Sequence, residues 1–277
     1  MIQLIVCDFD GTILDQQTQT IYPRVAQAIR QAQQAGIDFC AATGRNAPAA
    51  RKILRQAQIS SWLIDLNGAE LRDAEDHCLR QQTLSLPQVE QILDLCQDSG
   101  LLITVYAGES KIIFRDLQEH YEQYIGIEGS GKNTANYPMA RFLSEVQQRQ
   151  RPDQIEEPIF KVEIRGNDLA ALAAVRRTLS SLTTVELTSA FARNLEVLPR
   201  QCNKAAALEQ LRERLQLDRC QIAVFGDDLN DRCLFELYPC SYAVDNARPE
   251  IKALASRIIP SCQKQGPAEI IAALSHQ

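Results

Sequence analysis

The chain has 277 residues, a length that predicts about two domains at roughly 150 residues per domain. Hydrophobic residues make up 45% and charged residues 23%, which is ordinary globular composition and excludes a disordered chain. Lys and Arg number 29 against 35 Asp and Glu, for a formal net charge of -6. This acidic balance, with no basic stripe, argues against nucleic acid as a partner, because phosphodiester backbones would be repelled.

The nine cysteines form no Cys-x-x-Cys pair, so neither a disulfide framework nor a thiolate zinc site is expected. Cys7, Cys40 and Cys220 lie inside apolar runs and are expected to be small buried hydrophobes in a reducing, cytoplasmic environment. No apolar stretch approaches the ~18 residues that a membrane span requires, so no membrane partner is expected. We expect a monomer or a weak homodimer.

Strand-like and helix-like segments alternate over the first 70 residues. Short apolar runs separated by amphipathic stretches are typical of a parallel sheet covered by helices. Pro23 near the first turn and Gly36 after the last turn bound the first helix, and Asn46 is a candidate cap for the second. The expected elements are a strand at 4–9, a helix at 23–35, a strand at 38–43, a helix from 46 to about 57 and a strand at 62–66.

The same alternation returns near the C-terminus and predicts the rest of the parallel sheet. Leu195–Leu198 is expected to be a strand, and Asn203 can cap the helix that follows it. Another buried strand is expected over Ile222–Phe225. We therefore expect an α/β core formed by residues 1–83 and 191–277.

The middle of the chain differs and is expected to be a separate α/β unit, residues 84–190, inserted into the core. Its predicted elements include a helix at 87–99 and a hairpin formed by 101–106 and 112–114. Residues 121–157 are polar and are expected to be mostly irregular. Phe160–Arg165 alternates like a strand with one solvated face.

Two acidic clusters follow buried strands and are the strongest candidates for chemistry. Asp8-Phe-Asp10-Gly-Thr12 lies where the first strand ends, and Gly226-Asp227-Asp228-Leu-Asn230-Asp231 follows the strand at 222–225. In open parallel sheets, ligands bind at that edge. Each cluster alone could be a solvated turn, and Asp228 could be only a helix cap. Two clusters on equivalent strand ends are better explained by a shared cation, and their hard oxygen atoms favour Mg²⁺.

Two weaker signals lie at similar places in the predicted sheet. Thr43-Gly44-Arg45 ends the second strand, where a hydroxyl and backbone N–H groups can hold phosphate oxygens. A simple turn is the alternative interpretation. Lys204 opens the helix after Leu195–Leu198, a place where its charge opposes the helix dipole, so a nearby anion is plausible. A solvated surface charge is the alternative there.

Taken in chain order, the four sites resemble the four motifs of the haloacid dehalogenase superfamily of phosphoryl-transfer enzymes. Asp8-Phe-Asp10-Gly-Thr12 is similar to the first motif, Thr43-Gly44-Arg45 to the second, Lys204 to the third, and Gly226-Asp227 through Asn230-Asp231 to the fourth. Asn67-Gly68-Ala69 and the large α/β insertion are similar to its Cof-like subgroup. The resemblance covers essentially the whole chain. It implies a Rossmann-like parallel sheet core with an inserted α/β cap domain, and it implies that the cap acts as a lid that selects the substrate.

The resemblance also implies a role for each matching residue. Asp8 would be the nucleophile, and Asp10 the general acid/base that helps to form and discharge an aspartyl-phosphate. Mg²⁺ would be held by the Asp8 side chain, the Asp10 backbone carbonyl and Asp227, with Asp231 in or just behind its coordination shell. Thr43 and Lys204 would hold the phosphoryl oxygens, and Asn230 and Asn246 would lie at the phosphate pocket. From the residues themselves, the backbone of Gly44 is a further candidate for binding phosphate. Arg45 could reach substrate or pair with a carboxylate, and we expect it to contact substrate.

Two positions depart from the subgroup pattern. Ala205 and Asp245 stand where glycine is usual, and the extra carboxylate of Asp245 is expected to weaken phosphate binding by Asn246.

The expected function is a Mg²⁺-dependent phosphatase that acts on small phosphorylated metabolites, such as sugar or cofactor phosphates. One alternative is a phosphomutase, which returns the phosphoryl group to a sugar hydroxyl and which the motifs do not separate from a phosphatase. A regulatory phospho-acceptor module is a second alternative, although the length, the insertion and Asp10 argue against it. A glycosyltransferase with a D-x-D metal motif is a third, but it leaves the other motifs unexplained.

Overall fold

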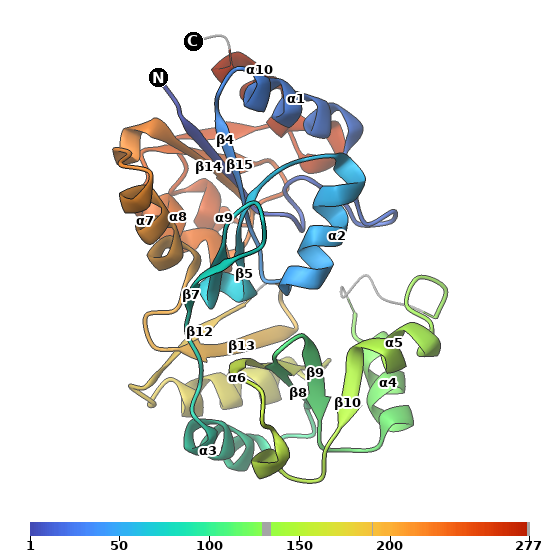
Figure 1. Ribbon diagram of the computed structural model, residues 1–277. Helices are drawn as coiled ribbons and strands as arrows, with labels where there is room; N and C mark the ends of the chain where they lie inside the picture. Colours follow the sequence, from blue (N-terminus) through green and yellow to red (C-terminus); the bar gives the residue numbers. More distant parts are fainter. Residues whose placement is uncertain (129–133, 190, 276–277) are drawn as a thin grey trace. The chain divides into compact units, whose positions relative to one another are not determined.

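The computed structural model describes residues 1–128, 134–189 and 191–275, and the chain divides into two compact units. The first unit comprises Met1–Gln81 and Asn203–Gln277, and the second comprises Gln82–Cys202. In Figure 1 the first unit is blue to teal and orange to red, and the second is mostly green and yellow.

An eight-stranded sheet forms the centre of the first unit, in the order β16-β15-β14-β1-β4-β5-β6-β7. The strands from β16 to β5 are all parallel, which confirms the predicted α/β fold, and β6 and β7 extend the sheet in antiparallel fashion. The strands are β1 (Leu4–Cys7), β4 (Asp38–Ala42), β5 (Trp62–Asp65), β6 (Glu70–Arg72), β7 (Cys78–Gln81), β14 (Ile222–Gly226), β15 (Cys240–Val244) and β16 (Arg257–Ile259).

Helices cover this sheet, and α1 and α10 lie side by side, as do α7 and α8 (Figure 1). Pro23 opens the first helix as predicted, and Asn203 caps α7 by accepting from the backbone N–H of Ala206. Asn46 occupies the N-cap position of α2 as predicted, but its side chain makes no capping hydrogen bond. The helices are α1 (Pro23–Gln34), α2 (Ala47–Ala57), α7 (Lys204–Arg214), α8 (Arg232–Leu237), α9 (Pro249–Lys252) and α10 (Gly266–Leu274).

Short elements complete the first unit. A small hairpin of β2 (Leu14–Asp15) and β3 (Thr20–Ile21) follows β1. The single-turn 3-10 helices are η1 (Leu66–Gly68), η3 (Arg219–Gln221), η4 (Leu229–Asp231) and η5 (Cys262–Lys264). The prediction that Cys220 is buried is wrong, because this residue lies in η3, before β14 begins, and is exposed.

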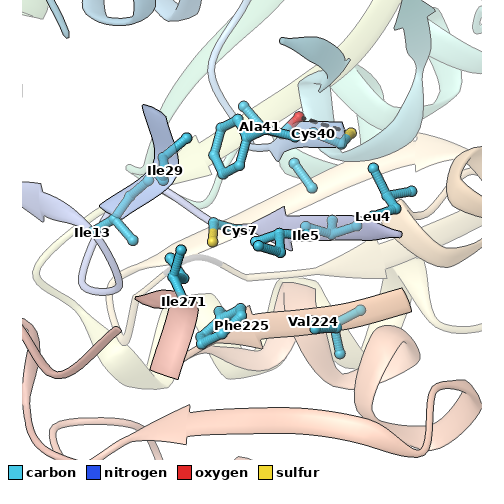
Figure 2. Close-up of a cluster of buried hydrophobic side chains, with 14 of the residues drawn as sticks. Leu4, Ile5, Cys7, Ile13, Ile29, Cys40, Ala41, Val224, Phe225 and Ile271 are labelled. Carbon is cyan, nitrogen blue, oxygen red and sulfur yellow. Dashed lines mark hydrogen bonds between the residues drawn. The ribbon is translucent and has the colours of Figure 1, made fainter. Parts of the chain in front are cut away.

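The apolar core of the first unit is built around β1, whose four residues are all buried. Figure 2 shows the β1 side chains between those of the neighbouring strands β4 and β14, with Ile29 of α1 and Ile271 of α10 close by. A strand buried on both faces has no solvated side, so it carries a continuous apolar run. The register pairs Cys7 with Ala41 of β4 and with Phe225 of β14, so these three strands end at one edge of the sheet.

The second unit contains a six-stranded sheet in the order β10-β9-β8-β11-β13-β12, and β8 and β9 form the predicted antiparallel hairpin. The stretch expected to be irregular holds most of α4, all of α5 and β10. The elements are α3 (Leu86–Cys96), β8 (Leu102–Ala107), β9 (Ser110–Ile113), α4 (Leu117–Ile125), α5 (Met139–Glu145), β10 (Val146–Gln148), η2 (Pro152–Gln154), β11 (Ile159–Arg165), α6 (Leu169–Leu179), β12 (Val185–Thr188) and β13 (Asn194–Pro199).

Two predictions about the second unit are wrong. The strand at Leu195–Leu198 was expected in the core, but it is part of β13, which pairs with β11 and β12 of the second sheet. The same apolar run could form a strand of either sheet, and only its hydrogen-bonded pairing shows which sheet it joins. The expected solvated face of β11 is also wrong, because Lys161 and Glu163 are buried there. Among the described residues, no helix is both long enough and apolar enough to cross a membrane.

Candidate active site

The predicted site residues of the first unit converge at the carboxyl edge of its parallel sheet. Asp8 follows β1 directly, Thr43 follows β4, and Asp227 follows β14. Because these strands are parallel neighbours that end in register, the three side chains come from one rim of the sheet. Asn67 follows β5, the next strand along the same rim.

Lys204 joins two of the aspartates and is fully buried. Its Nζ atom lies 2.6 Å from Oδ1 of Asp8 and 2.7 Å from Oδ1 of Asp231. Burial alone would lower the pKa of this ammonium, but the two carboxylates outweigh burial and raise the pKa above its usual value. The lysine is therefore a permanent cation inside the site, and its interpretation as a solvated surface charge is wrong.

Asp8 is buried, and for its carboxyl group the effect of burial on the pKa outweighs that of the neighbouring opposite charge, unlike for Lys204. Burial raises the pKa of Asp8 to about 8, with Asp231 and Asp10 adding to the rise and Lys204 opposing it. One lysine does not offset the desolvation and the neighbouring negative charges. An additional positive charge at this place would stabilise the ionised, nucleophilic form of Asp8.

Asp227 lies against the loop that follows β1. Its Oδ1 atom accepts a hydrogen bond of 3.0 Å from the Thr12 hydroxyl. Gly11 has φ +85°, and a Cβ atom there would lie 2.1 Å from Oδ2 of Asp227, so the contact requires glycine. Burial raises the pKa of Asp227 well above its usual value, and repulsion from Asp8, Asp231 and Asp228 raises it further.

The carboxylates of Asp8, Asp227 and Asp231 are arranged as a cation site. One oxygen from each lies within 4.8 Å of the others. Both oxygens of Asp231 are engaged by protein donors, Oδ1 by Lys204 and Oδ2 by the backbone N–H groups of Asp227 and Asp228. Hard carboxylate oxygens in a site with unrelieved negative charge fit a small divalent cation.

Asp10 is half-exposed and is held by Arg45. The Arg45 guanidinium donates from Nε to Oδ2 of Asp10 at 2.7 Å and from an Nη atom to Oδ1 at 2.5 Å. The same Nη atom also donates to Gln19 of the β2–β3 hairpin at 2.7 Å. Arg45 was expected to contact substrate; the structure places its side chain on the neighbouring carboxylate. Gln19 carried no signal in the sequence, because its contact depends on the fold of the hairpin.

Thr43 and Asn230 both form hydrogen bonds with Asn67. Thr43 is fully buried, and its hydroxyl accepts from the backbone N–H of Arg45 at 3.2 Å. Asn230 is buried and donates from Nδ2 to Oδ1 of Asn67 at 3.0 Å. Asn67 also lies against Gly44, where a Cβ atom would be 3.2 Å from its side-chain amide. The second and fourth motifs are thus linked through a residue outside both.

Asn246 has both ends of its side chain engaged with the backbone. Its Nδ2 atom donates to the carbonyl of Gly11 at 2.8 Å, and its Oδ1 atom accepts from the N–H of Cys262 at 2.9 Å. Asn246 therefore ties the loop after β1 to η5. The carboxylate of Asp245 pairs with Lys252 at 3.0 Å, so part of its charge is balanced on the surface.

Asp228 caps the short helix η4, which confirms that interpretation. Its Oδ1 atom accepts from the N–H of Leu229 at 2.6 Å and pairs with Nε of Arg248 at 2.7 Å. Asp228 is thus engaged in fixing the loop that carries Asn230 and Asp231.

Comparison with known proteins agrees with this geometry. The sequence model of the family described as haloacid dehalogenase-like hydrolase matches residues 5–271. The chain is 26% identical to phosphatase YwpJ of Bacillus subtilis (strain 168), over 97% of this chain and 98% of that protein. It is 25% identical to the 5-amino-6-(5-phospho-D-ribitylamino)uracil phosphatase YcsE of the same strain, over 98% of this chain and 94% of that protein.

A solved structure of a haloacid dehalogenase-like hydrolase from B. subtilis has the same fold, with a TM-score of 0.83 and 22% identity. The match covers 99% of this chain and 100% of the other. The family match spans nearly the entire chain and includes every strand end that contributes to the site. The chain is an enzyme of the haloacid dehalogenase-like hydrolase family.

Proposed function

We propose that this enzyme is a Mg²⁺-dependent phosphatase that hydrolyses phosphate monoesters of small metabolites, such as sugar or cofactor phosphates. The observation that carries the proposal is the buried Asp8 carboxylate, 2.6 Å from Lys204 and clustered with Asp227 and Asp231. The matched relatives are named phosphatases, and the name of one gives a phosphorylated small molecule as its substrate.

Charge balance explains why the site needs a cation. A phosphate monoester carries about -1.5 to -2 charges at neutral pH, and Asp8, Asp227 and Asp231 add three more. Lys204 contributes one positive charge, and a divalent ion would contribute two. Mg²⁺ bound by the Asp8 and Asp227 side chains and the Asp10 carbonyl would neutralise charge on the phosphoryl group and keep Asp8 ionised.

Asp8 is the nucleophile in this proposal. An oxygen of its carboxylate attacks phosphorus, the bond to the leaving alkoxide breaks, and an aspartyl-phosphate forms. Lys204 lies against this carboxylate and orients it through a hydrogen bond. Thr43, Gly44 and Asn230 are placed around the same rim, where hydroxyl, backbone and amide N–H groups donate to the phosphoryl oxygens.

Asp10 is the general acid and base. It gives a proton to the leaving alkoxide in the first step and takes one from the attacking water in the second, which releases inorganic phosphate. Arg45 holds both carboxylate oxygens of Asp10. Bidentate pairing of this kind orients a carboxylate but also favours its charged form. When Asp10 carries the proton, at least one of its two hydrogen bonds with Arg45 must therefore be broken.

The test is phosphate release from a panel of phosphorylated metabolites, with and without Mg²⁺ and with no bisphosphate activator. We expect Mg²⁺-dependent release by the wild type and none by Asp8→Asn, whose side chain has the same shape without the nucleophilic charge. Circular dichroism checks that the variant is folded. A folded Asp8→Asn variant with full activity contradicts the proposal. Isomerisation of a sugar phosphate that requires a bisphosphate activator and releases no inorganic phosphate would instead identify a phosphomutase.

A further inference from the structure

We propose that Asn67 is a positioning residue that sets the phosphate-binding geometry through Asn230 and Gly44. The inference rests on the proposed phosphatase function. Asn67 lies in η1, the single turn that follows β5, and is almost completely buried. Its backbone has φ +59° and ψ 29°, which is the left-handed region. Of the non-glycine residues, asparagine and aspartate tolerate that region best.

The backbone of η1 is bonded to the second motif. The N–H of Asn67 donates to the carbonyl of Thr43 at 2.9 Å, and the N–H of Leu66 donates to the carbonyl of Arg45 at 2.9 Å. The first hydrogen bond holds the peptide that carries the Gly44 N–H, and the second holds the peptide that follows Arg45. The orientation of the Gly44 peptide therefore depends on the conformation of η1.

The side chain of Asn67 reaches the fourth motif. Its Oδ1 atom accepts one of the two Nδ2 hydrogens of Asn230, at 3.0 Å. This hydrogen bond fixes the rotation of the Asn230 amide about its last bond. A preoriented donor costs no reorganisation when phosphate binds, so its contribution to binding is larger than that of a freely rotating amide.

The same turn also borders the third motif. Gly68 has φ +102°, and a Cβ atom there would lie 2.2 Å from the carbonyl oxygen of Asn203 and 3.1 Å from the backbone nitrogen of Lys204. The start of α7 therefore packs directly on η1. A three-residue turn thus contacts the segments that carry Gly44, Asn230 and Lys204, and Asn67 supplies its side-chain link.

The experiment is a double-mutant cycle with inorganic phosphate as the probe. Asn67→Gly removes the side chain but keeps the left-handed backbone accessible, and Asn230→Ala removes the amide that Asn67 orients. We expect Asn230→Ala to raise the inhibition constant of inorganic phosphate and KM about tenfold, the effect of losing one hydrogen bond to a charged group. Asn67→Gly should raise both constants by a smaller factor, because the Asn230 amide remains but is no longer oriented. The double variant should resemble Asn230→Ala alone within about twofold, because both changes break one interaction.

Gln58→Gly is the matched control. Gln58 has φ 55° at the exposed end of α2, so the same backbone change occurs away from the site. We expect its phosphate inhibition constant and KM to equal those of the wild type. Multiplicative effects of Asn67→Gly and Asn230→Ala would overturn the inference, as would a folded Asn67→Gly variant with unchanged constants.

Asn67→Ala keeps the test valid if Asn67→Gly does not fold. Alanine removes the amide acceptor without adding a charge, and it leaves a smaller gap than glycine in this buried turn. We expect this variant to fold and to raise the phosphate inhibition constant as Asn67→Gly does; wild-type phosphate inhibition would overturn the inference. A wild type that releases no phosphate refutes the proposed function instead, so the two failures are distinguishable.

Discussion

Arg45 holds Asp10 by both carboxylate oxygens, with distances of 2.7 Å from Nε to Oδ2 and 2.5 Å from an Nη atom to Oδ1. The Arg45 side chain is largely covered, whereas that of Asp10 is 46% exposed. The more buried side chain, Arg45, thus holds the more exposed one, Asp10. In the proposed mechanism, this contact sets the position of the Asp10 carboxyl group before substrate binds.

Arg45→Ala is therefore expected to lower kcat more than it raises KM. Without the guanidinium, Asp10 loses both of these hydrogen bonds, and general acid–base catalysis typically contributes 10²–10⁴-fold. We expect kcat to fall roughly tenfold to a hundredfold, with an intermediate loss for Arg45→Lys, which keeps the charge but not the two-point contact. Steady-state kinetics measure this, with Arg24→Ala at an exposed surface ion pair as the control. A rise in KM with kcat unchanged would show that Arg45 acts on substrate binding instead.

Lys204→Met is expected to destabilise the enzyme as well as inactivate it. The change leaves the buried carboxylates of Asp8 and Asp231 without their shared cation, and breaking a buried ion pair costs about 3–5 kcal/mol. Urea unfolding in EDTA should show a loss of this size. Adding Asp231→Asn should recover part of the stability but no activity. An unchanged free energy of unfolding in Lys204→Met would contradict the buried arrangement.

Mg²⁺ is expected to stabilise the folded wild type in the absence of substrate. Binding to the native state alone adds about 2.7 kcal/mol at a ligand concentration of 100 times Kd. Asp227→Asn should abolish this gain, and it should make the metal-free enzyme at least as stable as the wild type because it removes a repelled carboxylate. Thermal melting with and without Mg²⁺ tests both points. Asp94→Asn, an exposed change in α3, should leave the Mg²⁺ response intact.

The second unit is expected to lose stability in acid through Glu163. Burial opposes ionisation of this carboxyl group, but Arg165 and Lys161 outweigh it and lower the pKa to about 2. A carboxyl with a lowered folded pKa stabilises the fold above its unfolded pKa of about 4.5. That contribution is lost as pH falls from about 4.5 toward 2.

Glu163→Gln tests this pH dependence. We expect the variant to be less stable than the wild type at pH 7, by on the order of 3 kcal/mol, and the difference to shrink as pH falls from about 4.5 toward 2. Chemical unfolding at a series of pH values measures the difference. Glu119→Gln, at an exposed position of α4, is the charge control. A difference that stays constant across this pH range would contradict the lowered pKa.

Prediction from the sequence worked best where the signal is local. The buried run of β1, the proline at the start of α1 and the Asn203 cap each depend on a few adjacent residues, and the structure confirms all three. Local signals fail where a distant segment decides. Lys161 and Glu163 are polar, so β11 was expected to have a solvated face, yet Lys161 pairs with Glu196 of β13 at 2.6 Å inside the unit.

The candidate site divides in the same way. Neighbouring parallel strands end at the same edge of a sheet, which places Asp8, Thr43 and Asp227 together. The alternation of strand-like and helix-like segments along the chain predicted this parallel arrangement. Four contacts join residues 27 to 196 positions apart: Arg45 with Asp10, Lys204 with Asp8, Lys204 with Asp231, and Asn67 with Asn230. Hydrogen bonds need atoms within about 3 Å at defined angles, and only the folded chain brings such distant groups to that range.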